Sequence, residues 1–290
     1  PNTTLTKPHG YLFQVPTTGR SDAVPIKATG RFPKEAAAVT PSGDAIYITE
    51  DNFDFPSGLY RYLPPRPARA TKRVEDGGVL QMFKVAGVNK ADLSVGLPVG
   101  STFAGEWVTI EDPDPTFPPG TTNNQAIRAV GDEGRTKGAA IFSRLEGCYY
   151  ANGRIYFVST QGGATVPPDV APAGFGDGRG QVWMYDLEAN VLQLLYESPG
   201  SATLDLPDNI VVSPRRGLVL CEDGSADNFL RGLSRDGAFF DLARNIDPDQ
   251  VGQEFAGATF SPDGHTLYVN IQSGSGYSIA IWGPWERGPL

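Results

Sequence analysis

A strand–turn–strand pattern occurs four times along this chain of 290 residues. Each copy has an acidic residue at or near its start, continues into an apolar run, turns at Pro or Asn with Gly, and ends in a second apolar run. The copies occupy residues 31–51, 144–161, 206–224 and 254–272. A repeated hairpin is typical of radial or stacked β-architectures, in which neighbouring units bury one another's apolar faces. We therefore expect an all-β fold, a β-propeller of which this sequence supplies about four blades.

The repeat also places an acidic residue at one position of every copy, although folding does not require one there. These acids are Glu35, Glu146, Asp208 and Glu254. Carboxylates placed alike in successive blades would converge on one axis, where like charges repel and a cation is the natural companion. Glu35 and Glu254 lie in the apolar segments KEAAAV and EFAGATF, where an unpaired carboxylate would be costly. We therefore expect these acids to be metal ligands.

Two further oxygen donors belong to the same set. Asn209 directly follows Asp208, and Glu222 closes the second strand of its copy, as Glu50 and Asn270 do in theirs. Asp, Glu and Asn are all ligands of hard cations. The alternatives are ordinary structural roles, because Asp and Asn also begin turns and acids commonly decorate hairpin loops.

Arg144 lies two residues before Glu146 in the segment RLEG. In a strand, residues two apart share a face, so both side chains are expected to point toward the axis. Arg suits phosphate because its planar guanidinium donates two parallel hydrogen bonds. The alternative is a surface ion pair worth under about 1 kcal/mol.

Composition narrows the possible functions. The net charge of −9 argues against a nucleic-acid surface or an anionic-membrane surface, and it suits bound divalent cations. No run approaches the roughly 20 apolar residues of a membrane span. No segment resembles a signal peptide, so the chain reads as a mature or truncated product. Two histidines are too few for a zinc cluster, and two cysteines, Cys148 and Cys221, are expected to be small buried residues or a disulfide between blades.

Strands dominate the expected secondary structure. The sequence contains 35 Gly and 25 Pro, which suits many tight turns. The one helical window is short and runs from about Gln125 to Val130. Two long loops are expected, a basic one at 64–73 and a Gly/Pro-rich one at 162–180. The basic loop is either a solvated insertion or a lip that attracts anionic substrates.

Familiar catalytic motifs are missing from the sequence. It contains no GxSxG, HExxH, CxxC or Walker motif, and two histidines make a Ser/His/Asp mechanism improbable. Metal-assisted hydrolysis is the chemistry that this composition best allows.

Several segments, in this order, resemble the PhoX-type alkaline phosphatase family. They are KPHGYLFQV, ITEDNFDFPSGLYRYLPP, WVTIEDPDP, FSRLEGCYYANGRIYFVST, GQVWMYDL, LPDNIVVSPRRGLVLCEDG, EFAGATFSPDGHTLYVNIQ and AIWGPW. The resemblance implies a six-bladed β-propeller and a secreted phosphomonoesterase, periplasmic or extracellular, that uses Ca²⁺ together with Fe³⁺. The family's acidic ligands carry over onto Glu35, Glu146, Asp208 and Asn209, and its phosphate-binding arginine carries over onto Arg144.

The sequence departs from the family pattern in two places. Lys34-Glu35 stands where the family has His-Glu, and the family's Thr-Cys-Glu-Glu segment, whose cysteine binds iron, matches neither Cys148 nor Cys221. We therefore expect residues 1–290 to form one propeller domain that is incomplete on its N-terminal side. A second polypeptide or an N-terminal segment would complete it.

Three hypotheses follow from these observations. The first is a calcium-dependent phosphatase in which the ligands are Glu35, Glu146, Asp208, Asn209, Glu222 and Glu254 and Arg144 binds the phosphate ester substrate. The second is a calcium-dependent, lactonase-like propeller hydrolase, for whose neutral substrate Arg144 would have less use. The third is a non-catalytic propeller that binds a partner through its loops.

Overall fold

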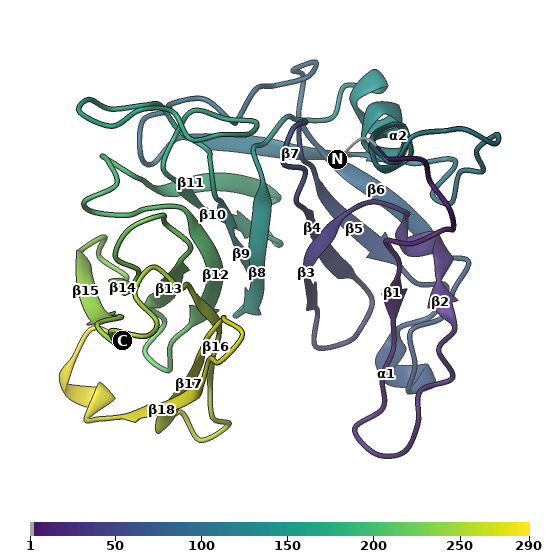
Figure 1. Ribbon diagram of the computed structural model, residues 1–290. Coiled ribbons are helices and arrows are strands. Elements are labelled where there is room, and N and C mark those ends of the chain that lie inside the picture. The colour runs from purple at the N-terminus through teal and green to yellow at the C-terminus, as the bar shows by residue number, and fades with distance from the viewer. Residues whose placement is uncertain (1–2) are drawn as a thin grey trace. The chain divides into compact units, whose positions relative to one another are not determined.

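The computed structural model describes residues 3–290 and divides them into two compact units (Figure 1). Unit 1 comprises the residues up to Asp92 together with Phe103–Leu145. Unit 2 comprises Leu93–Thr102 and Glu146–Leu290. Both units are built from antiparallel strands that follow one another in sequence, as the repeated hairpins predict.

Unit 1 contains one antiparallel meander with the strand order β3-β4-β5-β6-β7. Its strands are β3 (Lys34–Val39), β4 (Ile46–Glu50), β5 (Leu59–Leu63), β6 (Val79–Val85) and β7 (Thr102–Thr109). A short pair precedes it, β1 (Leu12–Phe13) with β2 (Pro25–Ile26), followed by the 3-10 turn Lys27–Thr29. The helices of this unit are α1 (Ala68–Thr71) and α2 (Asn123–Thr136).

Unit 2 contains three meanders. The first has the order β11-β10-β9-β8 and consists of β8 (Leu145–Ala151), β9 (Arg154–Ser159), β10 (Gln181–Asp186) and β11 (Val191–Glu197). The second consists of β12 (Pro207–Val212), β13 (Leu218–Glu222), β14 (Phe229–Leu233) and β15 (Phe239–Arg244). The third consists of β16 (Phe255–Phe260), β17 (Thr266–Ile271) and β18 (Ser278–Trp282), and the 3-10 turn Trp285–Arg287 follows it.

The four sequence repeats are confirmed as hairpins. They form the pairs β3/β4, β8/β9, β12/β13 and β16/β17, the first two strands of each meander. Two apolar clusters join the meanders of unit 2. One includes Val158, Val182 and Leu220, and the other includes Val219, Phe255 and Val269. Successive sheets that pack face to face in this way are what a radial β-architecture requires.

A β-bulge interrupts the first strand of three hairpins near the repeated acid. Lys34 pairs with Glu50 and the next pair is Ala37 with Ile48, so β3 holds one extra residue. The same shift follows Pro207 in β12 and Ala256 in β16. A bulge re-aims the side chains beside it, and bulges are frequent next to functional sites. The hydrophobic pattern predicts these strands but not their bulges.

Helix α2 is longer than the sequence suggested, since it covers 14 residues rather than the window from Gln125 to Val130. Thr122 caps it, accepting a hydrogen bond from the backbone N–H of Gln125, whose side chain reaches back to Thr122. The spacing of Thr122 and Gln125 fits the capping-box pattern, so the start of this helix was predictable from the sequence. Gly131 and Gly134 lowered the apparent helix propensity, but Gly134 packs close to the Met82 sulfur, where a Cβ would clash.

Residues 3–290 include no helix that is both long and apolar enough to cross a bilayer. Neither Cys148 nor Cys221 forms a disulfide, so the expected alternative of a bridge between blades is wrong. Cys221 is fully buried, as expected, whereas Cys148 is only half-buried.

Candidate active site

Three of the repeated acids belong to unit 2 and lie where β8, β12 and β16 begin. Glu146 is the second residue of β8 and is 4% exposed. Gly147, the next residue, faces the backbone of β12 so closely that an added Cβ would lie 2.8 Å from Asp208 O and 2.9 Å from Asn209 Cα. Only glycine permits such an approach. The fold therefore brings Glu146 beside the Asp208–Asn209 pair, as the repeat predicts.

Besides burial, the carboxylates of Asp208 and Glu254 both raise the pKa of the same thiol, that of Cys221. Burial in the apolar cluster raises the pKa of Cys221 to about 12, and the negative charges of Asp208 and Glu254 add to the effect. Glu254 is half-buried and directly precedes β16. The two carboxylates therefore occupy one neighbourhood, although they come from different meanders.

The side-chain oxygen of Asn209 is a candidate metal ligand. Its Oδ1 is buried, and within the described part of the chain it accepts no hydrogen bond. Buried polar atoms are nearly always satisfied, so such an oxygen indicates a bound cation or water. An amide oxygen beside Asp208 and Glu146 is the kind of ligand that calcium takes.

Glu222 has a different environment from the other acids of its set. It is fully buried, and Arg231 Nε donates to its Oε1 at 2.7 Å. The backbone N–H groups of Asp205 and Phe229 donate to its two oxygens, each at 3.0 Å. Burial raises the pKa of Glu222 to about 7 against the opposing effect of Arg231. With both oxygens engaged, Glu222 is part of a structural ion pair, and we leave it out of the proposed ligand set.

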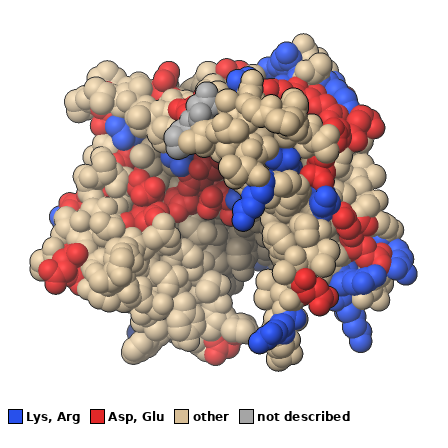
Figure 2. All heavy atoms as spheres, turned by 45° about the vertical axis from the view of Figure 1, so that its right-hand side comes forward, with Lys and Arg blue, Asp and Glu red and all other residues tan. Residues whose placement is uncertain are grey.

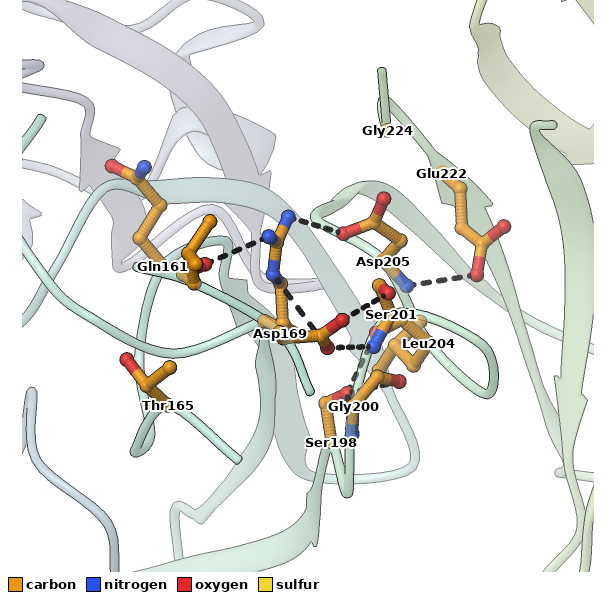
Figure 3. Close-up of polar contacts among 12 residues, drawn as sticks. Gln161, Thr165, Asp169, Ser198, Gly200, Ser201, Leu204, Asp205, Glu222 and Gly224 are labelled. Carbon is orange, nitrogen blue, oxygen red and sulfur yellow. Dashed lines mark hydrogen bonds and ion pairs between the residues drawn. The ribbon is translucent and has the colours of Figure 1, made fainter. Parts of the chain in front are cut away.

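Figure 3 shows how Glu222 connects through Asp205 to the Gly/Pro-rich loop 162–180. Arg179 donates from Nη1 to Asp205 Oδ1 at 3.0 Å and from Nη2 to the carbonyl of Val170 at 2.9 Å. Asp169 accepts from the backbone N–H of Ser201 at 2.6 Å and from its hydroxyl at 2.7 Å. These contacts fasten the loop at two points. No local sequence pattern indicates that Arg179 is the centre of such a network.

Glu35 lies in unit 1 on β3, and its side chain is exposed. The expectation of an apolar environment is wrong here, because the neighbouring alanines of KEAAAV are too small to cover it. Lys34 lies deeper, donating from Nζ to the carbonyls of Gly10 at 2.8 Å and Gly30 at 2.5 Å. Burial lowers the pKa of Lys34 to about 7.

Arg144 is the last residue before β8, and its backbone is left-handed with a φ of 42°. The expectation that Arg144 and Glu146 leave one regular strand on the same face is therefore wrong. The guanidinium donates from Nε to Asp51 Oδ1 at 2.9 Å and from Nη2 to Asp51 Oδ2 at 3.0 Å, and it lies over the ring of Phe53 at 5.4 Å. A left-handed backbone in a residue other than glycine costs roughly 1 to 2 kcal/mol and is often found at functional sites.

Glu50, which closes β4, is fully buried in unit 1. Asn52 Nδ2 donates to its Oε1 at 2.7 Å, and the Tyr60 hydroxyl donates to its Oε2 at 2.9 Å. Burial raises the pKa of Glu50 to about 7, against the opposing charge of Arg135. The position is the counterpart of Glu222, with neutral donors in place of an arginine.

This pKa predicts how the stability of unit 1 depends on pH. Between its ordinary pKa of 4.5 and about 7, the folded protein keeps a proton on Glu50 that the unfolded chain has lost. Stability is therefore lost as the pH rises through this window. We expect the melting temperature to fall between about pH 5 and about pH 8, reflecting on the order of 2 kcal/mol, and to fall less in Glu50→Gln. Glu106→Gln, at an exposed site of the same unit, should melt with the wild-type pH profile. Equal slopes for wild type and Glu50→Gln would contradict the assignment.

The basic loop 64–73 contains the short helix α1. Arg66 binds both oxygens of Glu75, and Arg73 lies 3.6 Å from the same carboxylate. Basic side chains gather toward the lower right of the face that Figure 2 shows. Part of the loop's positive charge is therefore neutralised locally.

The donor set suits a hard cation better than a soft one. Within residues 3–290 no three His, Cys, Asp or Glu side chains already lie close enough to form a metal cluster. The acids at the starts of β8, β12 and β16 and the buried oxygen of Asn209 nevertheless present only oxygen, which is what calcium prefers. Cys221 is fully buried in an apolar cluster, where burial disfavours the thiolate that iron binds.

Comparisons with known proteins agree with the fold. The model of a family described as alkaline phosphatase PhoX matches residues 2–275. The chain is similar to the structure of Pseudomonas fluorescens PhoX in complex with vanadate, a transition state analogue, with 19% identity and a TM-score of 0.61, over 88% of this chain and 54% of that one. This similarity confirms the all-β propeller fold. The chain thus spans about half the length of that protein.

Other similarities are weaker. Virginiamycin B lyase from Staphylococcus aureus matches with 12% identity and a TM-score of 0.36, over 89% of this chain and 71% of that one. A putative 6-phosphogluconolactonase from Bacteroides uniformis matches with 14% identity and a TM-score of 0.43, over 87% and 68%. None of the curated proteins compared with the sequence matches it.

Proposed function

Because the chain belongs to the alkaline phosphatase PhoX family, we propose that it is a metal-dependent hydrolase of phosphomonoesters. The observation that carries the proposal is the guanidinium of Arg144, which Asp51 holds through both Nε and Nη2. A guanidinium has five N–H donors, so one that gives two of them to a carboxylate can offer others, along its second edge, to two oxygens of a phosphoryl group. A neutral lactone makes less use of such a charged fork.

Arg144 is proposed to bind the substrate and Asp51 to orient Arg144. The Arg144 side chain is 15% exposed and that of Asp51 is 20% exposed, so the pair is sheltered without being sealed. The two hydrogen bonds to Asp51 fix the orientation of the Arg144 guanidinium, so the side chain has to move less when a phosphate binds. As negative charge develops on the equatorial oxygens, N–H groups of the guanidinium other than the two that Asp51 accepts would stabilise it. Asp51 touches the guanidinium and not the phosphate, so it is a positioning residue.

Calcium is the cofactor that we propose, held within unit 2 by Glu146, Asp208 and Asn209, with Glu254 as a further ligand. When bound, it would supply positive charge that polarises the phosphoryl oxygens. Arg144 precedes Glu146 by two residues, so their Cα atoms are at most about 7 Å apart. The chain itself therefore keeps the backbone of Arg144 near the backbone of the first metal ligand.

The complete enzyme is proposed to need more than these 290 residues, supplied by a further segment or a second polypeptide. We place it in the periplasm or outside the cell, as for the family. No step is assigned to iron, for which Cys221 is unsuited.

Calcium binding tests the ligand assignment directly. We expect Glu146→Gln and Asp208→Asn each to weaken calcium binding measured by calorimetry. The loss should be at least about 10- to 100-fold. That range is typical of residues that only hydrogen-bond to a metal ligand, and a ligand itself should matter at least as much. Glu188→Gln, in the exposed turn before β11, should bind calcium like the wild type. If Glu146→Gln and Asp208→Asn both keep the wild-type affinity, Glu146 and Asp208 are not the ligands.

A further inference from the structure

Unit 2 contains a second candidate binding site, a cavity of about 400 Å³ between its first two meanders. Its floor is largely apolar and includes Tyr156, Met184 and Leu195. Its rim includes Arg154, Arg216 and Arg235, three arginines in a protein whose net charge is −9. The volume lies at the small end of the range of about 300 to 1,000 Å³ that is typical of small-molecule sites.

The arginines of the rim are differently engaged. Arg154 Nε donates to Asp186 at 3.0 Å. The guanidinium groups of Arg216 and Arg235 form no hydrogen bond or ion pair with any residue that the structure describes. Asp236 also lines the cavity, but the Ser234 hydroxyl donates to it and lowers its pKa. Positive charge therefore prevails at the rim.

The backbone of Arg216 gives an independent reason to assign it a function. Four hairpin turns share one hydrogen bond, in which the fourth residue donates its backbone N–H to the carbonyl of a Ser or Thr three positions earlier. That fourth residue is left-handed in all four turns, with φ values of 68°, 88° and 73° at Gly43, Gly237 and Gly264 and 69° at Arg216. Glycine adopts this conformation without strain, whereas arginine does not. Arg216 is thus strained at a position where the same protein elsewhere uses glycine.

The cavity is separate from the candidate active site. Glu146 lies at the start of β8, whereas the cavity is lined by Asn152 and Arg154 beyond its end. Along β12, Asp208 lies at the start and Arg216 lies beyond the end. A strand rises about 3.3 Å per residue, so roughly 20 Å separates the two places.

We propose that this cavity binds a small amphiphilic anion. An aromatic or short acyl group would lie on the floor against Met184 and Leu195. One phosphate, sulfonate or carboxylate group would be held by Arg216 and Arg235. The two parts of the ligand match the two parts of the cavity, an apolar floor and a rim with unengaged guanidinium groups. This proposal does not rest on the phosphatase function.

Calorimetry with 2-naphthalenesulfonate tests the proposal, with two partial ligands as comparisons. We expect one site per chain, and binding at least about 10-fold weaker for 2-naphthol, which lacks the charge, and for sulfate, which lacks the apolar body. If 2-naphthol binds as tightly as the sulfonate, the arginines do not select the ligand. If sulfate binds as tightly, the floor contributes nothing. Either result overturns the proposal.

The variants Arg216→Gly and Arg235→Gln locate the site. Glycine relieves the strain at position 216, so the double variant should melt no lower than the wild type. It should bind 2-naphthalenesulfonate about 10-fold more weakly, since two exposed charge contacts are lost. Arg244→Gln removes an exposed arginine that pairs with Asp227 in the same unit, and it should bind within about 2-fold of the wild type. Unchanged affinity in the double variant would place the ligand elsewhere and refute the proposal.

Discussion

Replacing Arg144 by alanine is expected to lower phosphatase turnover by about 10- to 1000-fold, the range for loss of one strong transition-state donor. The guanidinium donates through two atoms to Asp51 and is only partly exposed, so it is already oriented. Arg144→Lys keeps the positive charge but loses the two-donor fork, and it should recover only part of the activity. Melting temperatures should change little, because alanine can replace arginine at this position without adding backbone strain.

Two further variants separate binding from positioning. Asp51→Asn keeps a group of the same shape but weakens the hold on Arg144, so KM should rise more than kcat falls. Arg244→Ala removes another arginine paired with an aspartate, and its turnover should equal that of the wild type. Full turnover in Arg144→Ala would show that this residue does not bind the phosphoryl group.

Replacing Arg231 by methionine is expected to lower the free energy of unfolding by about 3 to 5 kcal/mol, because a buried carboxylate would lose its cation. Arg231 is 3% exposed and Glu222 is fully buried, and 2.7 Å separates Nε from Oε1. The double variant Arg231→Met/Glu222→Leu should recover part of the loss, since it leaves no buried unpaired charge; Asp241, the second partner of Arg231, is exposed to solvent. Denaturant unfolding measures all three proteins.

A further variant, Glu222→Gln, decides what Glu222 does. If Glu222 is structural, Glu222→Gln should reduce stability and leave calcium affinity unchanged. A large loss of calcium affinity with unchanged stability would instead restore Glu222 to the ligand set.

The repeat predicted the strands of the fold because alternating and apolar runs separated by Pro, Asn and Gly determine hairpins locally. All four hairpins appear in their expected places. The length of α2 was underestimated, because its two glycines lower the helix propensity of its second half although the Thr122–Gln125 capping box marks its start. Gly134 is there for packing against Met82, a long-range contact that local patterns cannot reveal.

The site was predictable in part. Glu146, Asp208 and Asn209 lie side by side, because corresponding positions of stacked hairpins occupy corresponding places. The bulge in β3, the exposure of Glu35 and the left-handed backbone of Arg144 were not predictable, because each depends on how strands pair and what covers them. The partner of Glu222 is Arg231, nine residues away on the next strand, and strand register alone brings the two together.

Hydrolysis of 4-nitrophenyl phosphate by the full-length protein tests the central claim most directly. The initial rate should be measured with calcium, with excess chelator, and with calcium restored. The account predicts hydrolysis that disappears with the chelator, returns with calcium, and falls strongly in Arg144→Ala. If calorimetry shows calcium bound to the full-length protein and no hydrolysis occurs, the protein is not the phosphatase proposed.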